Sequence, residues 1–466
     1  MSVISRLWAS RKQRPLFVIF TGMVLGFFLV YPFIDLYLRM INFEVTPFTY
    51  NDFSSYTEAI YRWLHGQPIY WRGGWGFHGS YLYPPAYLLL FTIFAWVQNF
   101  SVLTILPFVH STYEVGPILW GLFSLGLLWI GLQKVVRSLE VSLGVIDRIV
   151  LLWAIIGFQP FLYSFKWAQT GTFQAAIFCF SFVAFRYGRQ TMNVGNRFAS
   201  GFLTAIGGLM KLFYAPAGAH LLQDRDRFLG ATLGGLFVLF LSITVFGIEN
   251  LLLYLEVLQW GKGWNSVRTW YLWGPTYYEP LYAIISIFAL GTAILSEFGL
   301  SIAMQESTST LIRVVGLQTL RVGGLLGVIL LSLGTRKNNV FKEVFALGLI
   351  SVPLFAPQAY TYDLLILLPA AIILTKTEYE RSGHLWLPVL SVFLLNIQAY
   401  GYKLLVDGLP PLIPIESITR PLVVMLQPGV WGNLILFGLA VFRIIERSNI
   451  TRKCQIFGIN PLKNRQ

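Results

Sequence analysis

Three charged side chains have the types and positions that group transfer from a phosphate to an alcohol would need. Asp52 lies in a long polar stretch, residues 39–83, between two apolar runs. Lys211 lies inside an apolar run, and Asp363 opens another. A carboxylate can take the proton of a hydroxyl group as a new bond forms, and a cation can stabilise a phosphate as it leaves. Asp52 is the candidate base, Lys211 the candidate cation.

Asp52 and Asp363 each have a simpler interpretation. Asp52 is also compatible with a solvated loop carboxylate, or with the N-cap of a helix over residues 53–64. Asp363 stands where a carboxylate would interact with the positive end of the helix that follows. The sequence leaves these alternatives open.

Lys211 lies about ten residues from each end of the apolar run 201–222. A lysine near mid-depth is costly and usually faces a partner or a wet cavity, although its long side chain can also extend to the membrane surface. Gly207, Gly208 and Pro216 flank it, so a helix broken at the lysine is predicted. Anionic phosphate is the partner that its charge favours.

Two further polar regions border the apolar runs. Residues 248–280 form a second loop rich in tryptophan and tyrosine, which favour the headgroup layer and also stack on sugar rings. Lys166, Gln169 and Gln174 surround Gly171, where two apolar runs nearly meet. These polar groups line a site or merely join two helices.

The composition indicates the protein class. The 466 residues are 56% hydrophobic and 12% charged, which predicts an all-α polytopic membrane protein. The net charge of +13 comes mostly from short breaks between apolar runs, so nucleic acid is not an expected partner. Two cysteines cannot form a disulfide framework, and five scattered histidines lack metal-ligand spacing. We therefore expect neither a metal site nor a cofactor.

Apolar runs of spanning length predict about eleven to thirteen membrane crossings. They occur near residues 16–38, 84–109, 115–133, 149–165, 172–188, 199–222, 228–247, 281–298, 314–334, 341–357, 363–376, 385–401 and 422–443. We expect one domain over 1–466, with a membrane-embedded core over 16–443, a cytoplasmic tail over 444–466, and an uncleaved first span with its amino terminus inside. The expected location is the plasma membrane, as a multi-pass protein.

Basic residues predict the orientation of the spans. Breaks rich in arginine and lysine look cytoplasmic, which places the polar loops 39–83, 248–280 and 402–421 outside. Two places conflict with this scheme. If 84–109 and 115–133 both cross, Lys134, Arg137 and Arg148 lie outside, and segment 281–298 makes the number of crossings inconsistent unless it stays at one face.

Taken in order, several short motifs resemble those of glycosyltransferase family 87, the polyprenyl-phosphate-mannose-dependent mannosyltransferases of the GT-C superfamily. The matching positions are Asp52, Gly66 to Tyr70, Tyr83-Pro84-Pro85, Gly171 to Gln174, Lys211, Asn265-Ser266 and Thr361-Tyr362-Asp363. Departures from the family pattern are Thr172, Gln174 and the pair Leu364-Leu365.

The resemblance implies a GT-C-like helical bundle whose extracytoplasmic loops carry the active site. It implies inverting transfer of a hexose, commonly mannose, from a polyprenyl-phosphate sugar to a lipid or glycan acceptor. Asp52 would be the general base and Lys211 the cation near the donor phosphate. The other residues that would bind the substrate are Asn265, Asp363, Gln174 and Tyr83. The family is thought to need no obligatory metal, so the implied partners are the two substrates and membrane lipids.

Three other classes compete with this interpretation. A secondary transporter would favour paired broken helices in two related halves, and only one candidate break is visible. A polymerase or ligase that uses a lipid-diphosphate donor would share the topology but have a different leaving group. A purely structural membrane protein would leave Lys211 unexplained. In an enzyme, Asp52, Lys211 and Asp363 should meet in one outward-facing site.

Overall fold

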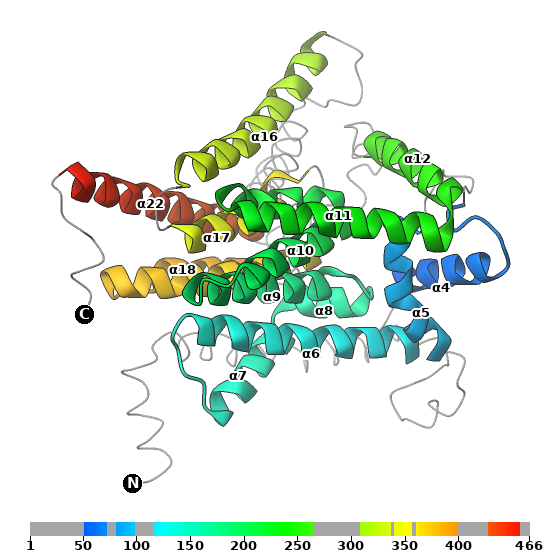
Figure 1. Cartoon of the computed structure of the whole chain (residues 1–466), viewed down its shortest axis with the longest axis horizontal. Coiled ribbons are helices and arrows are strands. Elements are labelled where there is room, and N and C mark those ends of the chain that lie inside the picture. The colour runs from blue at the N-terminus through cyan, green and yellow to red at the C-terminus, as the bar shows by residue number, and fades with distance from the viewer. Residues whose placement is uncertain are drawn as a thin grey trace, which may run out of the picture.

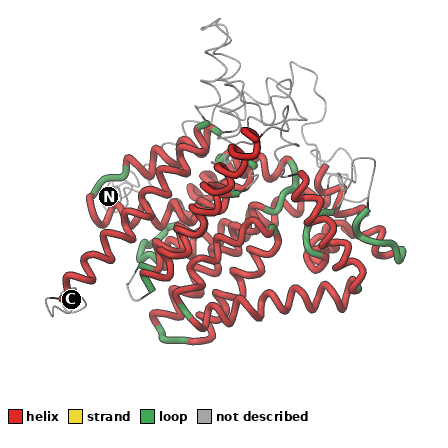
Figure 2. Tube along the Cα trace, turned by 90° about the horizontal axis from the view of Figure 1, so that it is seen from above, coloured by secondary structure: helices red, strands yellow, loops and turns green. Residues whose placement is uncertain are grey.

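The structure is a computed structural model that describes residues 51–71, 81–97, 115–264, 308–336, 340–356, 360–398 and 427–456. Within these ranges the regular elements are all helices, packed side by side in a bundle (Figures 1 and 2). The predicted all-α membrane protein is thus confirmed. The predicted spans 16–38 and 281–298, the loop 402–421 and Asn265 lie outside the described residues.

The first half of the chain runs from the polar stretch into the bundle. Its elements are α4 (Asn51–Leu64), η1 (Pro85–Tyr87), α5 (Leu88–Val97), α6 (Val115–Ser138), α7 (Val145–Ile156), α8 (Gln159–Lys166), α9 (Gly171–Gln190), α10 (Val194–Met210), η4 (Leu212–Gln223), α11 (Arg225–Phe246) and α12 (Ile248–Trp264). The second half comprises α16 (Thr308–Gly334), α17 (Phe341–Phe355), η5 (Thr361–Ile366), α18 (Leu367–Ser382), α19 (Trp386–Ile397) and α22 (Pro428–Ile456).

In the described part, three helices are long and apolar enough to cross a membrane: α6, α11 and the first 21 residues of α22. Helices α7 and α8 together form a fourth candidate, bent by 66° at the break between them. A contact with another helix stabilises this bend, because the Gln159 backbone N–H donates to the Asn396 side chain of α19 at 2.9 Å. The larger number of crossings predicted from the sequence remains a prediction.

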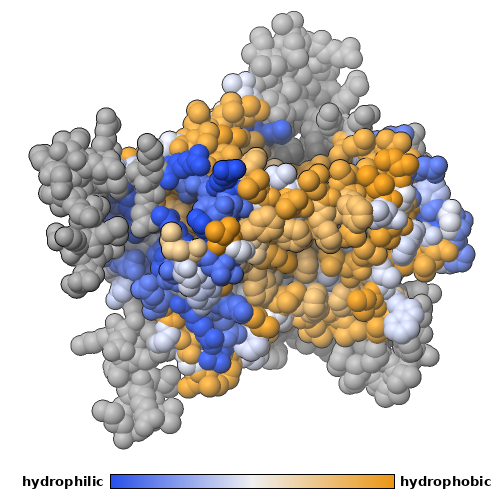
Figure 3. Space-filling model, in the orientation of Figure 1, coloured by the Kyte–Doolittle hydropathy of each residue, from blue (hydrophilic) through white to orange (hydrophobic). Residues whose placement is uncertain are grey.

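Ionic side chains gather at one end of the bundle, which we call the charged end. Arg186 pairs with Glu140 at 3.1 Å, and Arg197 pairs with Asp226 at 2.8 Å. In Figure 3 hydrophilic residues gather on the left, whereas apolar residues cover the middle of the molecule. Apolar surface flanked by a charged end is the pattern expected of a protein that crosses a bilayer.

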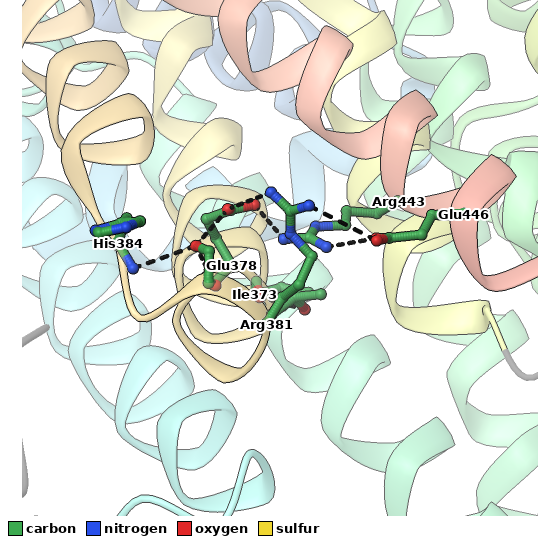
Figure 4. Close-up of polar contacts among 8 residues, drawn as sticks. Ile373, Glu378, Arg381, His384, Arg443 and Glu446 are labelled. Carbon is green, nitrogen blue, oxygen red and sulfur yellow. Dashed lines mark hydrogen bonds and ion pairs between the residues drawn. The ribbon is translucent and has the colours of Figure 1, made fainter.

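A buried ionic network ties α18 to α22 at the charged end (Figure 4). Glu378 accepts hydrogen bonds from Arg443, from Arg381 at 3.2 Å and from Ser382 at 2.8 Å. Arg443 also pairs with Glu446 at 2.6 Å. Both Glu378 and Arg443 are almost fully shielded, and such a pair holds two helices in one register because breaking it would leave a buried charge.

Helix α6 runs toward the charged end, which removes one conflict in the predicted orientation. Near its start the Trp120 indole donates to the Gln169 carbonyl at 3.3 Å, and the Tyr83 hydroxyl donates to the Gln169 side chain at 3.4 Å. At its other end the Ser138 carbonyl accepts from Arg186 at 3.1 Å. The chain therefore leaves Tyr83 and enters α6 at the same end of the bundle, which does not fit one crossing between them; residues 98–109 of the predicted span 84–109 lie outside the described residues. Lys134 and Arg137, near the end of α6, therefore lie at the charged end.

The single span predicted over 199–222 is also wrong, because the chain folds back on itself there. Helix α10 ends at Met210, Lys211 has an extended backbone, and η4 returns alongside α10. Thr204 lies 3.3 Å from His220 across the two arms, and Arg197 lies 3.5 Å from Asp224. The break predicted from the flanking glycines and proline is confirmed, and it places Lys211 at the tip of a hairpin.

Two predicted loops contain helices. The stretch 39–83 includes α4, in agreement with the alternative of a helix over residues 53–64, and 248–280 begins with α12. Helices α4, α5 and α12 gather on the right of Figure 1, away from the charged end. We call this the site end, because the candidate residues lie there.

Candidate active site

Asp363 is the centre of a buried polar cluster. It lies in the first turn of η5 and is fully buried. Its Oδ1 accepts hydrogen bonds from the Lys211 ammonium at 2.9 Å and from the Tyr214 hydroxyl at 2.7 Å. Its Oδ2 accepts from the Tyr360 backbone N–H at 2.9 Å. The carboxylate is thus both a helix cap and the partner of a buried cation, so the two interpretations of Asp363 hold together.

Lys211 points into the protein. Its side chain is only 10% exposed, and its ammonium lies 4.6 Å from the centre of the Tyr362 ring and 5.8 Å from that of Tyr214. This ammonium is held by a carboxylate and two aromatic rings inside the protein, so the side chain does not extend to the membrane surface. Because its backbone is extended between two helices, the side chain can reach Asp363, 152 residues along the chain.

Tyr214 is a member of this cluster that the motifs did not indicate. It lies in the first turn of η4, three residues after Lys211, and its backbone N–H donates to the Lys211 carbonyl at 2.8 Å. Its ring is fully buried, and its hydroxyl interacts electrostatically with Tyr83 as well as with Asp363. Tyr214 therefore connects the ion pair to the aromatic part of the site.

Gly171 explains how α9 and η5 come together beside this pair. A Cβ atom on Gly171 would lie 2.6 Å from the carbonyl oxygen of Tyr362. Only glycine therefore permits the backbones to approach so closely. The contact sets the position of the residue immediately before Asp363.

We expect Gly171→Ala to displace η5 and lower both stability and transfer activity. Overpacking of this kind costs about 1–3 kcal/mol. Gly126→Ala in α6 is the matched control, because a Cβ there meets nothing within 4 Å and alanine favours a helix. Thermal unfolding and transfer rates of the two variants check this. Equal behaviour of the two would show that the Gly171 contact does not position the site.

Gln174 joins α9 to α10 near the hairpin tip. Its Oε1 accepts from the Thr170 hydroxyl at 3.1 Å, and its Nε2 donates to the Gly207 carbonyl at 3.0 Å. The side chain is fully buried. These contacts fix the end of α10 just before Lys211, so the geometry supports a positioning role for Gln174.

Tyr83 connects the cluster to α4. Its hydroxyl accepts from the Tyr56 hydroxyl at 3.2 Å and donates to Gln169 at 3.4 Å. Tyr56 stacks on Phe91 with ring centres 4.0 Å apart, and Phe53 packs edge-on against the same ring. Helix α4 is therefore anchored by its buried aromatic face directly beside Tyr83.

Further tyrosines surround Tyr83 on the side away from Lys211. The Tyr70 hydroxyl donates to the Tyr83 carbonyl at 2.6 Å, and Tyr81 donates to the Pro84 carbonyl at 3.2 Å. Burial, reinforced by neighbouring phenols, raises the pKa of Tyr70 and Tyr81 well above the usual value. Both therefore stay neutral and act as hydrogen-bond donors. The Asn250 side chain of α12 accepts from the Ile69 N–H at 2.9 Å and holds this loop in place.

The comparison with protein families decides the class. The sequence model of glycosyltransferase family 87 matches residues 81–357, more than half of the chain. The chain belongs to glycosyltransferase family 87. It is thus a membrane glycosyltransferase. Comparisons with curated proteins and with solved structures gave no match.

The family 87 match covers some of the candidate residues and not others. Tyr83, Gln174 and Lys211 lie within it, and the structure brings them into one region with Asp363, which follows it. Asp52 precedes the matched range and lies in the first turn of α4; only its backbone is described. Asn265 comes one residue after the end of α12, outside the described residues.

No group of three or more metal-ligating side chains occurs in the described part of the glycosyltransferase. The polar atoms of the site are instead an ammonium, a carboxylate, amides and phenols. Such a set can bind a phosphate and sugar hydroxyl groups directly.

Proposed function

We propose that this glycosyltransferase transfers a hexose, with mannose as the first candidate, from a polyprenyl-phosphate sugar to a lipid or glycan acceptor. The transfer inverts the configuration at the sugar C1. The observation that carries this proposal is the buried Lys211–Asp363 pair at the tip of a helical hairpin, where a cation can reach a phosphate at the membrane boundary. The proposed donor is a lipid with a single phosphate. Its phosphate group would therefore contact the protein at the membrane boundary, where Lys211 lies.

The concentration of basic residues at the charged end supports a cytoplasmic position for that end. Arginines such as Arg186, Arg189 and Arg197 concentrate there, and basic residues favour the cytoplasm. The site end then faces outward, which supports transfer on the extracytoplasmic face of the plasma membrane. The same orientation is compatible with the proposed multi-pass, GT-C-like arrangement.

Lys211 would stabilise the leaving group. The bond between the sugar C1 and the phosphate oxygen breaks in this reaction, and negative charge develops on that phosphate. A charge-assisted hydrogen bond from the ammonium strengthens as the charge grows. Asp363 and Tyr214 would hold the ammonium in place, so they act as positioning residues.

Asp52 would be the base. The acceptor oxygen attacks C1 from the face opposite the phosphate, and its proton passes to the Asp52 carboxylate. One displacement of this kind inverts C1. The anchoring of α4 beside Tyr83 supports this assignment, because it brings the start of the helix to the aromatic side of the site. Asn265, Gln174 and Tyr83 complete the proposed binding residues, and no metal or cofactor takes part.

The test is a transfer assay with the full chain in lipid vesicles. Three labelled donors are compared, each with EDTA present: mannose on polyprenyl phosphate, mannose on polyprenyl diphosphate, and glucose on polyprenyl phosphate. We expect transfer from the mannosyl monophosphate only. Use of the diphosphate alone would favour the polymerase or ligase class. Solute movement across the vesicles without transfer would favour a transporter and contradict the proposal.

A further inference from the structure

Arg227, at the charged end, is a buried cation without a counter-ion in the described part of the chain. It lies in the first turn of α11, and its side chain is fully buried. Its guanidinium carbon lies 3.7 Å from the centre of the Phe185 ring in α9. All three guanidinium nitrogens lack a hydrogen-bond partner among the described residues.

Glycines allow this arginine to reach across the bundle. A Cβ on Gly201 of α10 would lie 1.8 Å from the Arg227 carbonyl oxygen, and one on Gly230 would lie 2.0 Å from the Phe198 carbonyl oxygen. The backbones of α10 and α11 are therefore in direct contact. From this crossing the Arg227 side chain extends past α10 to α9.

Two more arginines lie over the neighbouring ring. Phe185 packs edge-on against Phe341 with ring centres 4.7 Å apart, and Arg189 and Arg186 lie 4.9 and 5.9 Å from the centre of the Phe341 ring. Glu140 neutralises Arg186 at 3.1 Å. Arg189 is exposed and forms no salt bridge within the described residues. Within the described residues, neither Arg227 nor Arg189 forms a salt bridge; Arg189 interacts with Asp224 only at longer range.

A buried, unpaired guanidinium carries a large desolvation cost. Ring stacking offsets part of this cost on one face of the group, but it satisfies none of the N–H donors in the guanidinium plane. The planar fork of N–H donors matches a carboxylate or a phosphate, and two arginines around one anion are typical of phosphate recognition. The two acids nearest the start of α11, Asp224 and Asp226, are already paired with Arg197.

We propose that Arg227 and Arg189 form a phosphate-binding site at the charged end, separate from the active site. Helix α9 begins at Gly171 beside Asp363 and, at about 30 Å long, carries Arg189 to the opposite end. The proposal therefore goes beyond the transfer reaction. The site lies at the charged end of a bundle whose apolar surface fits a bilayer, at the level where lipid headgroups would lie. This favours the phosphate of an anionic phospholipid, whose acyl chains would lie along the apolar surface of the bundle, over free phosphate.

The experiment compares the full-length protein with three variants in nanodiscs. Arg227→Leu removes the buried cation, Arg189→Ala removes the exposed one, and Arg225→Leu is the matched control because Arg225 is exposed on the same helical turn. Retained phosphatidylglycerol is counted by native mass spectrometry. Thermal stability is measured in phosphatidylcholine nanodiscs with and without phosphatidylglycerol, and with added inorganic phosphate.

We expect phosphatidylglycerol to bind and stabilise the wild type and the Arg225→Leu variant. Affinity should fall about 10- to 100-fold in each of the other two variants. Stabilisation by inorganic phosphate alone, lost in the same two variants, would assign the site to free phosphate. Equal lipid and phosphate binding by Arg189→Ala and the wild type would overturn the proposal. Arg189→Ala keeps the test decisive if Arg227→Leu does not fold.

Discussion

Replacing Asp52 with asparagine should lower the rate of sugar transfer by about 10²- to 10⁴-fold, the contribution typical of a general base. Asparagine has nearly the same shape and keeps hydrogen-bonding capacity, but it cannot accept the acceptor's proton. Binding of the polyprenyl-phosphate donor should be unchanged, because the proposed donor contact is made by Lys211 and not by Asp52. The measurement is the initial rate of labelled mannose transfer, together with donor affinity.

Glu58→Gln provides the control for this variant. Glu58 lies on the same helix, α4, is about half exposed, and pairs only loosely with Arg62 at 3.8 Å. The Glu58→Gln variant loses the same charge at the same end of the protein but keeps the proposed base, so it should retain wild-type activity. If Asp52→Asn is as active as Glu58→Gln, Asp52 is a solvated carboxylate and the base lies elsewhere.

Lys211→Met should have two effects at once. Donor affinity should fall about 10- to 100-fold, because a charge-assisted contact to the phosphate is lost. The free energy of unfolding should fall by about 3–5 kcal/mol, because Asp363 stays buried without its cation. Donor titration and thermal unfolding measure the two effects separately.

A double variant separates the structural role of the ion pair from its role with the donor. In Lys211→Met with Asp363→Asn the buried charge is gone, so much of the stability should return while donor affinity stays low. Lys211→Arg, which keeps the charge, should lose less affinity than Lys211→Met. Wild-type donor affinity in the stable double variant would show that Lys211 only holds α10 and η5 together.

The sequence was sufficient for the class and for the helix break. Because no water lies in the bilayer core, every backbone polar group must be paired within the chain, so long apolar runs predict helices without reference to tertiary contacts. The break at Lys211 followed from Gly207, Gly208 and Pro216, which are local signals. The family 87 resemblance rested on short motifs and was confirmed by the match over residues 81–357.

Hydropathy could not give the path of the chain. The run 199–222 is mostly apolar, and its apolarity is the same whether the segment crosses once or folds back. The hairpin is shown by contacts between its two arms, such as those of Thr204 with His220 and of Arg197 with Asp224. In the same way, the direction of α6 is shown only by its contacts with Gln169 near one end and Arg186 at the other. These two residues belong to other parts of the chain, so hydropathy does not report the contacts.

The sequence by itself determined that this protein is an all-α membrane protein with Lys211 and Asp363 as unusual charges. Only the tertiary structure decided that the two charges form one buried pair, with Tyr214 as a third member. The physical reason is that a charge in a membrane protein needs a partner, and the partner's identity depends on which helices pack together. That choice depends on close contacts such as that of Gly171 with Tyr362, between residues far apart in the chain.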